Sequence, residues 1–212
     1  MSESSLFKRS KPTRVVFDIG NVLLVWNPRR LYRNIFSTES EVEYFLTRVL
    51  PPEWNLEQDR GRPWSEAETL QIAQFPQYAA EIRAWRARWI EMIPDAIHGT
   101  VAILEALKAQ GIPLYAITNF ASDTLQEAKS RYAFLANSFI DMVVSGDEKL
   151  LKPDPAIYQV LLDRQKLGAE DCVFIDDSQA NVDAAAALGF HALHFTTPEV
   201  FAADLRALGF NV

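Results

Sequence analysis

The sequence predicts an α/β protein with a doubly wound, Rossmann-type parallel sheet into which an all-helical segment is inserted. From about residue 95 to the C-terminus, short apolar runs alternate with segments of helical spacing, which is typical of a parallel sheet covered by helices on both faces. Between residues 27 and 94 the apolar residues recur at helical spacing and no run resembles a strand. We therefore expect a core domain made of residues 1–26 and 95–212, and a helical domain made of residues 27–94.

The expected elements can be justified one after another along the chain. The run 15–17 is β-branched and aromatic, as in a strand buried on both faces, and it ends at Asp18. About four helices should follow before Pro94, with breaks at Pro51-Pro52 and Gly61-Arg62-Pro63. The expected core strands are then 113–118, 140–144, 172–175 and 190–194, and the expected core helices are 97–107, 121–131, one from about 155, one capped by Ser178 and ending at Gly189, and 198–208.

The composition excludes several functional classes. The chain has 212 residues, 49% of them hydrophobic, and a formal net charge of −7, so it is a poor partner for nucleic acids and for anionic membranes. Cys172 is the single cysteine, which excludes an internal disulfide and a cysteine-cluster metal site. No apolar run is long enough to span a bilayer, and the polar first residues do not resemble a signal peptide. We therefore expect a cytoplasmic protein without nucleic-acid or membrane partners, and the sequence indicates no oligomeric state.

Polar side chains follow four of the expected apolar runs, namely Asp18, Thr118-Asn119, Lys152 and Asp176-Asp177. The carboxyl ends of parallel strands meet at one edge of the sheet, where such folds bind ligands. A carboxylate can act as a nucleophile, a hydroxyl and an amide can hydrogen-bond a transferring group, and a lysine neutralises its charge. An acidic pair that offers only oxygen ligands suits a magnesium ion, Mg²⁺, better than zinc. Each residue alone is an ordinary turn or capping residue, but their order along one sheet favours a site.

These residues resemble the four sequence motifs of the haloacid dehalogenase (HAD) superfamily of aspartyl hydrolases. The matching stretches are Phe17-Asp18-Ile19-Gly20-Asn21-Val22, Thr118-Asn119, Lys152-Pro153 and Asp176-Asp177-Ser178-Gln179-Ala180-Asn181. The helical segment is similar to the helical cap of that superfamily. The resemblance covers the chain from Arg14 to the C-terminus and implies a HAD-like core.

The resemblance also implies the role of each residue. Asp18 would be the nucleophile that forms an aspartyl intermediate. Thr118 and Asn119 would hold the transferring group, and Lys152 would bridge it to Asp18.

A bound Mg²⁺ is implied by the same resemblance. Its ligands would be Asp18, the backbone carbonyl of Gly20 and, from the acidic pair, Asp177 with Asp176 assisting.

One position departs from the pattern of the superfamily. Its phosphatases usually carry a second aspartate, a general acid and base, two residues after the nucleophile, and this chain has Gly20 there. General acid catalysis contributes roughly 10²–10⁴-fold, so we expect rates that depend steeply on the leaving group unless another acid is supplied. Glu57 and Asp59 are candidates for that acid, although a solvated polar loop is the more ordinary interpretation of both.

Three functions follow as hypotheses. The leading one is a Mg²⁺-dependent phosphatase of a small phosphorylated metabolite, and the Gly20 form of the first motif resembles a branch that includes glucose-1-phosphate phosphatases, which makes a sugar phosphate a candidate. The alternative is an L-2-haloacid dehalogenase, because a halide leaves without a proton and so needs no acid at position 20. Tyr158, six residues after Lys152, also resembles a position that those enzymes use. Without a cation, however, Asp176 and Asp177 would repel Asp18. The third is a catalytically weak, phosphate-binding regulatory protein.

The remaining candidates have more ordinary interpretations. Cys172 is expected to be a buried thiol, and His191 and His194 to be structural, whereas His98 could approach the site. Trp26 should either line the substrate pocket or pack against the helices, and the other four tryptophans should form the core of the helical segment. The chain crosses between core and cap at 25–28 and 93–96, which are the expected hinges.

Overall fold

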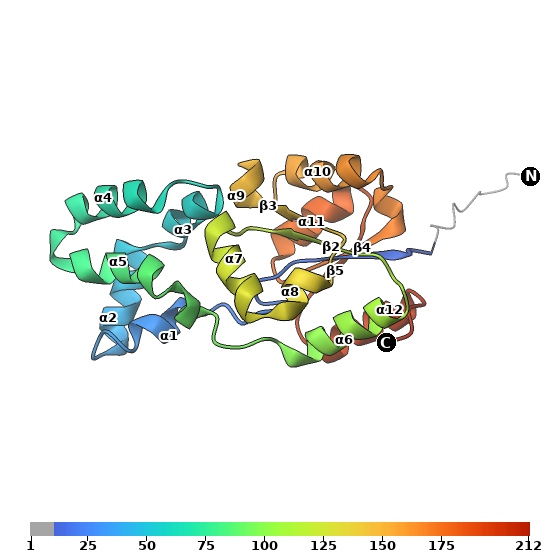
Figure 1. The fold of residues 1–212 in the computed structure, drawn as a ribbon, viewed down its shortest axis with the longest axis horizontal. Helices are drawn as coiled ribbons and strands as arrows, with labels where there is room; N and C mark the ends of the chain where they lie inside the picture. Colours follow the sequence, from blue (N-terminus) through green and yellow to red (C-terminus); the bar gives the residue numbers. More distant parts are fainter. Residues whose placement is uncertain (1–10) are drawn as a thin grey trace, which may run out of the picture.

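A five-stranded parallel sheet lies at the centre of the structure, a computed structural model that describes residues 11–212 (Figure 1). The polar stretch at residues 1–10 lies outside the described residues. The strand order is β3-β2-β1-β4-β5, and every neighbouring pair is parallel. Each expected strand is confirmed to within one residue at either end, and the strands are β1 (Arg14–Phe17), β2 (Leu114–Thr118), β3 (Asp141–Val144), β4 (Cys172–Asp176) and β5 (His191–His194).

The central strand β1 is buried on both faces, as its apolar sequence predicts. Val15 and Phe17 belong to the hydrophobic cluster on one face of the sheet, and Val16 belongs to the cluster on the other. Phe17, the last residue of β1, is in register with Ala116 of β2 and Ile175 of β4. The three strands therefore end close together, and the residues that follow them lie at one edge.

Helices cover both faces of the sheet, which confirms the doubly wound fold. α6 and α12 lie below the sheet in the view of Figure 1, and α10 and α11 lie above it. Two short helices, α8 and α9, were not expected from the sequence because each has five residues or fewer. The core helices are α6 (His98–Ala109), α7 (Ser122–Arg131), α8 (Ala133–Asn137), α9 (Ser145–Glu148), α10 (Pro155–Gln165), α11 (Gln179–Ala187) and α12 (Pro198–Ala207).

Residues 27–94, which we call the helical insertion, extend from one end of the sheet (Figure 1). All of these residues are described and none is in a strand, as expected. The insertion has five α-helices rather than about four, because a capping box at Thr38 and Glu41 begins a second helix soon after the first ends. The helices are α1 (Pro28–Tyr32), α2 (Glu39–Tyr44), α3 (Pro52–Asp59), α4 (Trp64–Gln74) and α5 (Ala79–Ala87), and π-helical residues Phe45–Val49 continue α2.

Tryptophans fill the centre of the insertion, as expected. Trp54, Trp85 and Trp89 are buried, and Trp64 is partly buried against them. The ring of Trp26 lies 6.1 Å from that of Trp85 and 6.0 Å from that of Trp89, centroid to centroid. Trp26 therefore joins the aromatic core of the insertion at the point where the chain enters it.

The two segments that connect the insertion to the sheet run side by side. The backbone N–H of Val25 donates to the carbonyl of Asp95 at 3.0 Å, and that of Asn27 donates to Met92 at 2.8 Å. Leu24 also forms an isolated antiparallel bridge with Ala96. The two expected crossings are thus hydrogen-bonded to one another.

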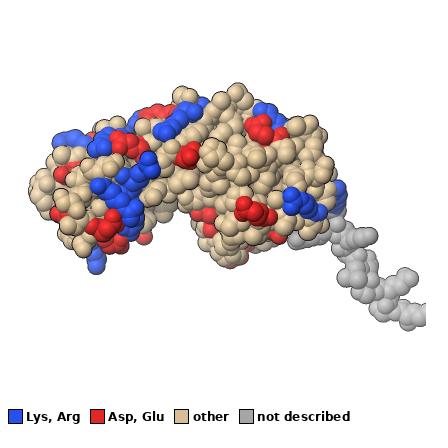
Figure 2. All heavy atoms as spheres, turned by 90° about the horizontal axis from the view of Figure 1, so that it is seen from below, with Lys and Arg blue, Asp and Glu red and all other residues tan. Residues whose placement is uncertain are grey.

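Charged side chains of both signs are mixed on the surface. Figure 2 shows lysine and arginine side chains beside acidic ones over the insertion, on the left of that view. Ion pairs such as Arg33–Glu39, 2.6 Å apart, account for part of this mixing. Within residues 11–212, no helix has the length and apolar character needed to cross a bilayer. The cytoplasmic location stays a prediction.

Candidate active site

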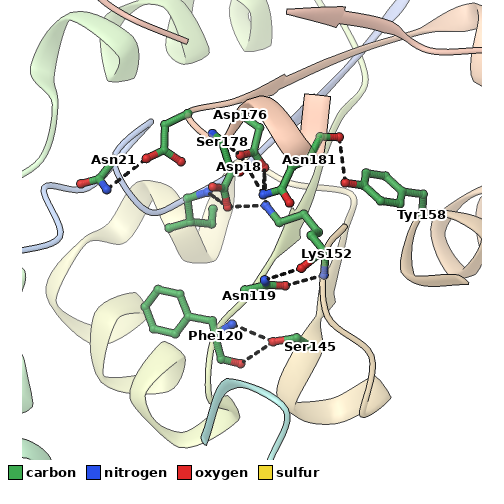
Figure 3. A network of polar contacts seen from close by, with 12 residues as sticks. Asp18, Asn21, Asn119, Phe120, Ser145, Lys152, Tyr158, Asp176, Ser178 and Asn181 are labelled. Carbon is green, nitrogen blue, oxygen red and sulfur yellow. Dashed lines mark hydrogen bonds and ion pairs between the residues drawn. The ribbon is translucent and has the colours of Figure 1, made fainter. Parts of the chain in front are cut away.

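Asp18, Asn119, Lys152 and Asp176 meet at the carboxyl edge of β1, β2 and β4 (Figure 3). Asp177 lies beside Asp18 and Asp176, and Thr118 is the last residue of β2. Asp18 follows β1, and its backbone N–H donates to Ile175 of β4 at 2.9 Å. Lys152 arrives from the loop after α9 and places its Nζ 2.8 Å from Asp18 Oδ1 and 2.6 Å from Asp176 Oδ2. One buried lysine therefore joins the carboxylates of two strands.

Asn119 fixes the position of that lysine. Its Oδ1 accepts from the backbone N–H of Lys152 at 2.8 Å, and its Nδ2 donates to the Lys152 carbonyl at 3.0 Å. Both polar atoms of the amide are thus engaged with one residue of the chain. The side chain of Asn119 acts on the position of Lys152, a function that its type and spacing did not indicate.

Asp176 is held by a set of donors at the start of α11. The backbone N–H of Ser178 donates to Asp176 Oδ1 at 2.8 Å, and Asn181 Nδ2 lies 2.9 and 3.1 Å from its two carboxylate oxygens. The expectation that the Ser178 side chain caps α11 was wrong: Ser178 occupies the N-cap position, but its hydroxyl makes no capping hydrogen bond. Its backbone amide instead orients the carboxylate of Asp176.

Asp18, Asp176 and Asp177 form a cluster that suits a hard cation. Each offers a carboxylate oxygen, and these oxygens lie within 4.8 Å of one another. Asp177 is the most exposed of the three, and its Oδ2 accepts from Asn21 Nδ2 at 3.1 Å. A cluster of oxygen donors without sulfur or imidazole fits Mg²⁺. The donor set of the structure therefore agrees with the metal that the sequence predicts.

The electrostatics of the cluster also favour a cation. Burial raises the pKa of Asp18 from its ordinary 3.8 to about 7; the charge of Lys152 opposes the rise, and those of Asp176 and Asp177 add to it. Burial likewise raises the pKa of Asp177. Burial alone would lower the pKa of Lys152, but the two adjacent carboxylates outweigh it and raise that pKa. A charged lysine therefore faces three acids, and one positive charge does not balance them.

Thr118 ends β2 with a hydroxyl that has no hydrogen-bond partner among the described residues. The side chain is 1% exposed, so water does not satisfy it at the surface. Buried polar groups without partners are uncommon and call for an explanation. A bound group that accepts a hydrogen bond from Oγ1 would supply one.

A cleft of about 600 Å³ separates the sheet edge from the insertion. Asp18, Lys152 and Asp177 line it from the core, and Trp26 and Trp85 line it from the side of the insertion. A smaller adjoining cavity of about 80 Å³ is lined by residues that include Gly20, Trp26, Asp59, Trp89 and Phe120. Trp26 borders both spaces and also packs against the tryptophans of the insertion, so both expectations for this residue are met.

Asp59 corrects the expectation of a solvated polar loop. It is the last residue of α3, it is only partly exposed, and it lines both spaces. Burial raises its pKa well above the ordinary value, and the negative charge of Asp18 adds to the rise, whereas a hydrogen bond from the Ala121 backbone opposes it. Glu57 is exposed and lies 3.7 Å from Arg60, as expected of a solvated acid. The sequence offered no way to separate these two acids, because it does not show which face of α3 meets the core.

Gly20 leaves open the space that a second aspartate would enter. A Cβ built on it would have no described atom within 4 Å outside its own chain neighbours, and its backbone is not in the left-handed region. Gly20 also lines both the cleft and the smaller cavity. The structure therefore has room for an acid at this position.

The remaining candidate residues lie elsewhere. Cys172 is buried at the start of β4, as expected. His194 Nε2 lies 3.0 Å from the carbonyl of Asp177 and so contacts the backbone beside the cluster. His98 does not approach the site: its side chain is 79% exposed and lies 3.2 Å from Asp95. Tyr158 is fully buried against Phe174 of β4, and its hydroxyl donates to the carbonyl of Asn181 at 3.0 Å.

Comparison with known proteins agrees with this architecture. Residues 13–189 match the family described as haloacid dehalogenase-like hydrolases. A sesquiterpene phosphatase, AstK of Aspergillus oryzae, is 30% identical over 196 residues, which make up 91% of this chain and 94% of that protein. The 6-phosphogluconate phosphatase of Escherichia coli is 29% identical over 56% of this chain, and the match spans half of its own length.

A solved structure has the same fold. The magnesium complex of a HAD family enzyme from Bacteroides thetaiotaomicron aligns with 93% of this chain and 100% of its own, with a TM-score of 0.73 and 18% identity. At that identity the likeness concerns the arrangement of the backbone. It covers both the sheet and the helical insertion.

Proposed function

The chain belongs to the haloacid dehalogenase-like hydrolases, and on that premise we propose that it is a Mg²⁺-dependent phosphatase that forms an aspartyl-phosphate on Asp18. The observation that carries this proposal is the cluster of Asp18, Asp176 and Asp177 around a single buried lysine. A nucleophilic carboxylate can attack an anionic phosphoryl group only where the repulsion between the two is relieved. An unbalanced acidic cluster that holds a divalent cation allows that attack.

The metal site follows from the donor set. Asp18, Asp177 and the backbone carbonyl of Gly20 would hold the ion, with Asp176 assisting. Bound there, Mg²⁺ supplies a Lewis acid that neutralises charge on the phosphoryl oxygens. The name of the magnesium-bound neighbour supports the choice of metal.

The protein residues carry the two chemical steps. In the first, a carboxylate oxygen of Asp18 bonds to phosphorus while the bond from phosphorus to the ester oxygen breaks. In the second, a water oxygen bonds to phosphorus and the Asp18 ester breaks, which releases inorganic phosphate. Lys152 balances charge beside Asp18, Asn119 holds Lys152, and the unpartnered hydroxyl of Thr118 donates to a phosphoryl oxygen.

The substrate is a small phosphorylated metabolite, and a sugar phosphate is the first candidate. The cleft wall combines the aromatic faces of Trp26 and Trp85 with the polar side chains of Asn27, Arg29 and Asn55. Aromatic faces and amides together suit a ring that has apolar faces and hydroxyl edges. Because relatives are named for a sesquiterpene and for phosphogluconate, a terpenyl phosphate belongs in the same screen.

The proposal assigns different roles to two domains. Residues 1–26 and 95–212 form the core that carries the chemistry, and residues 27–94 form a cap that closes over it. The cleft between them supports this division because both contribute to its lining. Closure would exclude water while the phosphoryl group is transferred.

The dehalogenase alternative has less support. Tyr158, which suggested it, is fully buried, hydrogen-bonds the backbone carbonyl of Asn181 and does not itself line the cleft. The acidic cluster would also lack a cation in a metal-free enzyme. A catalytically weak regulatory protein is disfavoured by the complete set of strand-end residues.

A hydrolysis screen tests the proposal. Phosphorylated metabolites and 2-haloacids are incubated with Mg²⁺ and, separately, with a chelator, and phosphate and halide release are measured. We expect phosphate release that the chelator abolishes, Mg²⁺ restores and Asp18→Asn lacks. Halide release at full rate in the chelator would instead establish the dehalogenase, and a fully active Asp18→Asn variant would end the covalent mechanism.

A further inference from the structure

Asp59 lines the same cleft as Asp18, the proposed nucleophile. Within residues 11–212, five ionisable side chains line the cleft, namely Asp18, Arg29, Asp59, Lys152 and Asp177. Asp18 is assigned as the nucleophile, Asp177 belongs to the acidic cluster, and the basic residues Arg29 and Lys152 are each paired with a carboxylate. Among the described residues of this lining, Asp59 is the acid that the chemistry has not used.

The carboxyl group of Asp59 is fixed from both sides of the cleft. Asn55 Nδ2, one turn earlier on α3, donates to Asp59 Oδ2 at 2.8 Å. The backbone of Ala121, just beyond β2, faces the carboxyl group closely enough to lower its pKa. The Ser145 hydroxyl meanwhile donates to the backbone carbonyl of Asp59 at 2.5 Å, which ties the end of α3 to the core. A side chain held in this way needs little reorganisation before it acts.

The position of Asp59 suits it to replace the aspartate that is missing at position 20. Asp59 lines the two spaces that Gly20 lines, and Asn119 lines both as well. Asp59 therefore borders the same space that an aspartate at position 20 would enter. We propose, on the basis of the phosphatase function above, that Asp59 is the general acid and base of the reaction and acts in place of a residue at position 20.

The proposed role balances the two steps. As the Asp18 oxygen bonds to phosphorus and the ester bond breaks, the Asp59 carboxyl gives its proton to the leaving oxygen, which departs as an alcohol. Asp59 is then a carboxylate, and it takes a proton from the water whose oxygen bonds to phosphorus. The bond from phosphorus to Asp18 breaks, and Asp59 is protonated again. One ester and one water give one alcohol and one phosphate.

The surroundings of Asp59 favour the protonated form of its carboxyl group. Burial and the charge of Asp18 raise the pKa of Asp59 well above its ordinary value. The charged groups that face the same cleft are Asp18 with its partner Lys152, Asp177, and Arg29, which is paired with Glu43. A raised pKa favours the protonated form of a carboxyl group, which is the form that can give a proton to a leaving oxygen.

The test compares leaving groups in the full-length, Mg²⁺-loaded protein. Values of kcat/KM are measured for p-nitrophenyl phosphate, whose alcohol leaves readily, and for simple alkyl phosphates, whose alcohol needs a proton. We expect the parent to depend weakly on the leaving group. Asp59→Asn should lose roughly 10²–10⁴-fold on alkyl esters and little on the aryl ester. Glu57→Gln removes an exposed carboxylate from the same helix and should change neither rate.

Two further measurements separate chemistry from structure. Gly20→Asp in the Asp59→Asn background should restore activity on alkyl esters, because a side chain at position 20 meets open space. The decline of the alkyl-ester rate at high pH, caused by ionisation of Asp59, should also be missing in Asp59→Asn.

The outcomes that overturn the inference are distinct from those that overturn the phosphatase function. A steep leaving-group dependence in the parent removes Asp59 from the mechanism and leaves the phosphatase function intact. The same conclusion follows if a folded Asp59→Asn variant loses equal activity on both ester classes and Gly20→Asp does not rescue it. Steep dependence in the parent overturns the inference even if the variant fails to fold. Absence of any Mg²⁺-dependent phosphate release from either ester overturns both proposals.

Discussion

Lys152 Nζ lies 2.8 Å from Asp18 Oδ1, and the two side chains are only 1% and 10% exposed. Such a pair is stable only while both partners are present, because a single charge left in a buried site costs roughly 3–5 kcal/mol. Asp176 Oδ2 lies 2.6 Å from the same Nζ, so the lysine keeps one carboxylate if the other is removed. The nucleophile can therefore be replaced by an amide without leaving a buried lysine unpaired.

The two acids after β4 should respond differently to substitution. Asp177→Asn should raise the Mg²⁺ concentration needed for half-maximal activity more than Asp176→Asn does, because Asp177 is the more exposed of the two and is the expected direct ligand. Asp176→Asn should lower the melting temperature more, since it disturbs contacts to Lys152, Ser178 and Asn181. Metal titration of activity and thermal unfolding measure the two effects. Equal Mg²⁺ requirements in both variants would contradict the assignment of Asp177 as the direct ligand.

Thr118→Val should weaken the binding of phosphate without weakening the fold. The Thr118 hydroxyl is buried and lacks a partner among the described residues, so an isosteric apolar side chain costs nothing in the free protein. Competitive inhibition by inorganic phosphate should become weaker, while the melting temperature stays level or rises.

Thr100 provides the matched control, since its hydroxyl is also buried and unpartnered among the described residues but belongs to α6. Thr100→Val should leave phosphate inhibition unchanged. If both variants lost phosphate binding equally, the role of Thr118 would be disproved.

Locking the two crossings together should slow turnover. Val25 and Asp95 are hydrogen-bonded neighbours on the paired segments, close enough for a disulfide between Val25→Cys and Asp95→Cys. The oxidised form should show a lower kcat with unchanged Mg²⁺ binding, and the reduced form of the same protein is the control. Equal kcat values in the two forms would argue against closure of residues 27–94 as part of the cycle.

The metal-free protein should become less stable as the pH rises from about 4 to about 7. The pKa values of Asp18, Asp59 and Asp177 are raised by burial, that of Asp18 from 3.8 to about 7. Between these values the folded protein binds more protons than the unfolded chain, so the free energy of unfolding falls with rising pH. Melting temperatures in chelator should therefore drop across this range, and less so in Asp18→Asn. Added Mg²⁺ should reverse the drop, whereas a rise in chelator would contradict the electrostatic account.

The sequence was sufficient to predict the sheet and the polar groups at its edge. Val15–Phe17 and the later apolar runs mark buried strands, and the residues that follow β1, β2 and β4 must meet because parallel strands end together. The role of Asp59 was not accessible in this way. It depends on how α3 is turned toward the core, which is set by contacts such as Ser145 with the Asp59 carbonyl, between residues far apart in the chain.

Local roles within the site were also hidden from the sequence. The contact of Asn119 with the transferring group stays a prediction, and the sequence did not show that its side chain holds the backbone of Lys152. Ser178 was expected to cap a helix through its hydroxyl, yet its amide orients Asp176. In both cases the residue type and position fit more than one hydrogen-bond partner, and tertiary packing selects among them.

The central claim, a covalent phosphoryl group on Asp18, is tested most directly by the stereochemical course at phosphorus. An aryl phosphorothioate made chiral by its oxygen isotopes is hydrolysed by the Mg²⁺-loaded protein in isotopically labelled water, and the configuration of the released thiophosphate is determined. Attack by Asp18 followed by attack of water inverts phosphorus twice, so the account predicts net retention, with no reaction above background in Asp18→Asn. Net inversion would mean that water attacks the substrate directly and would contradict the account.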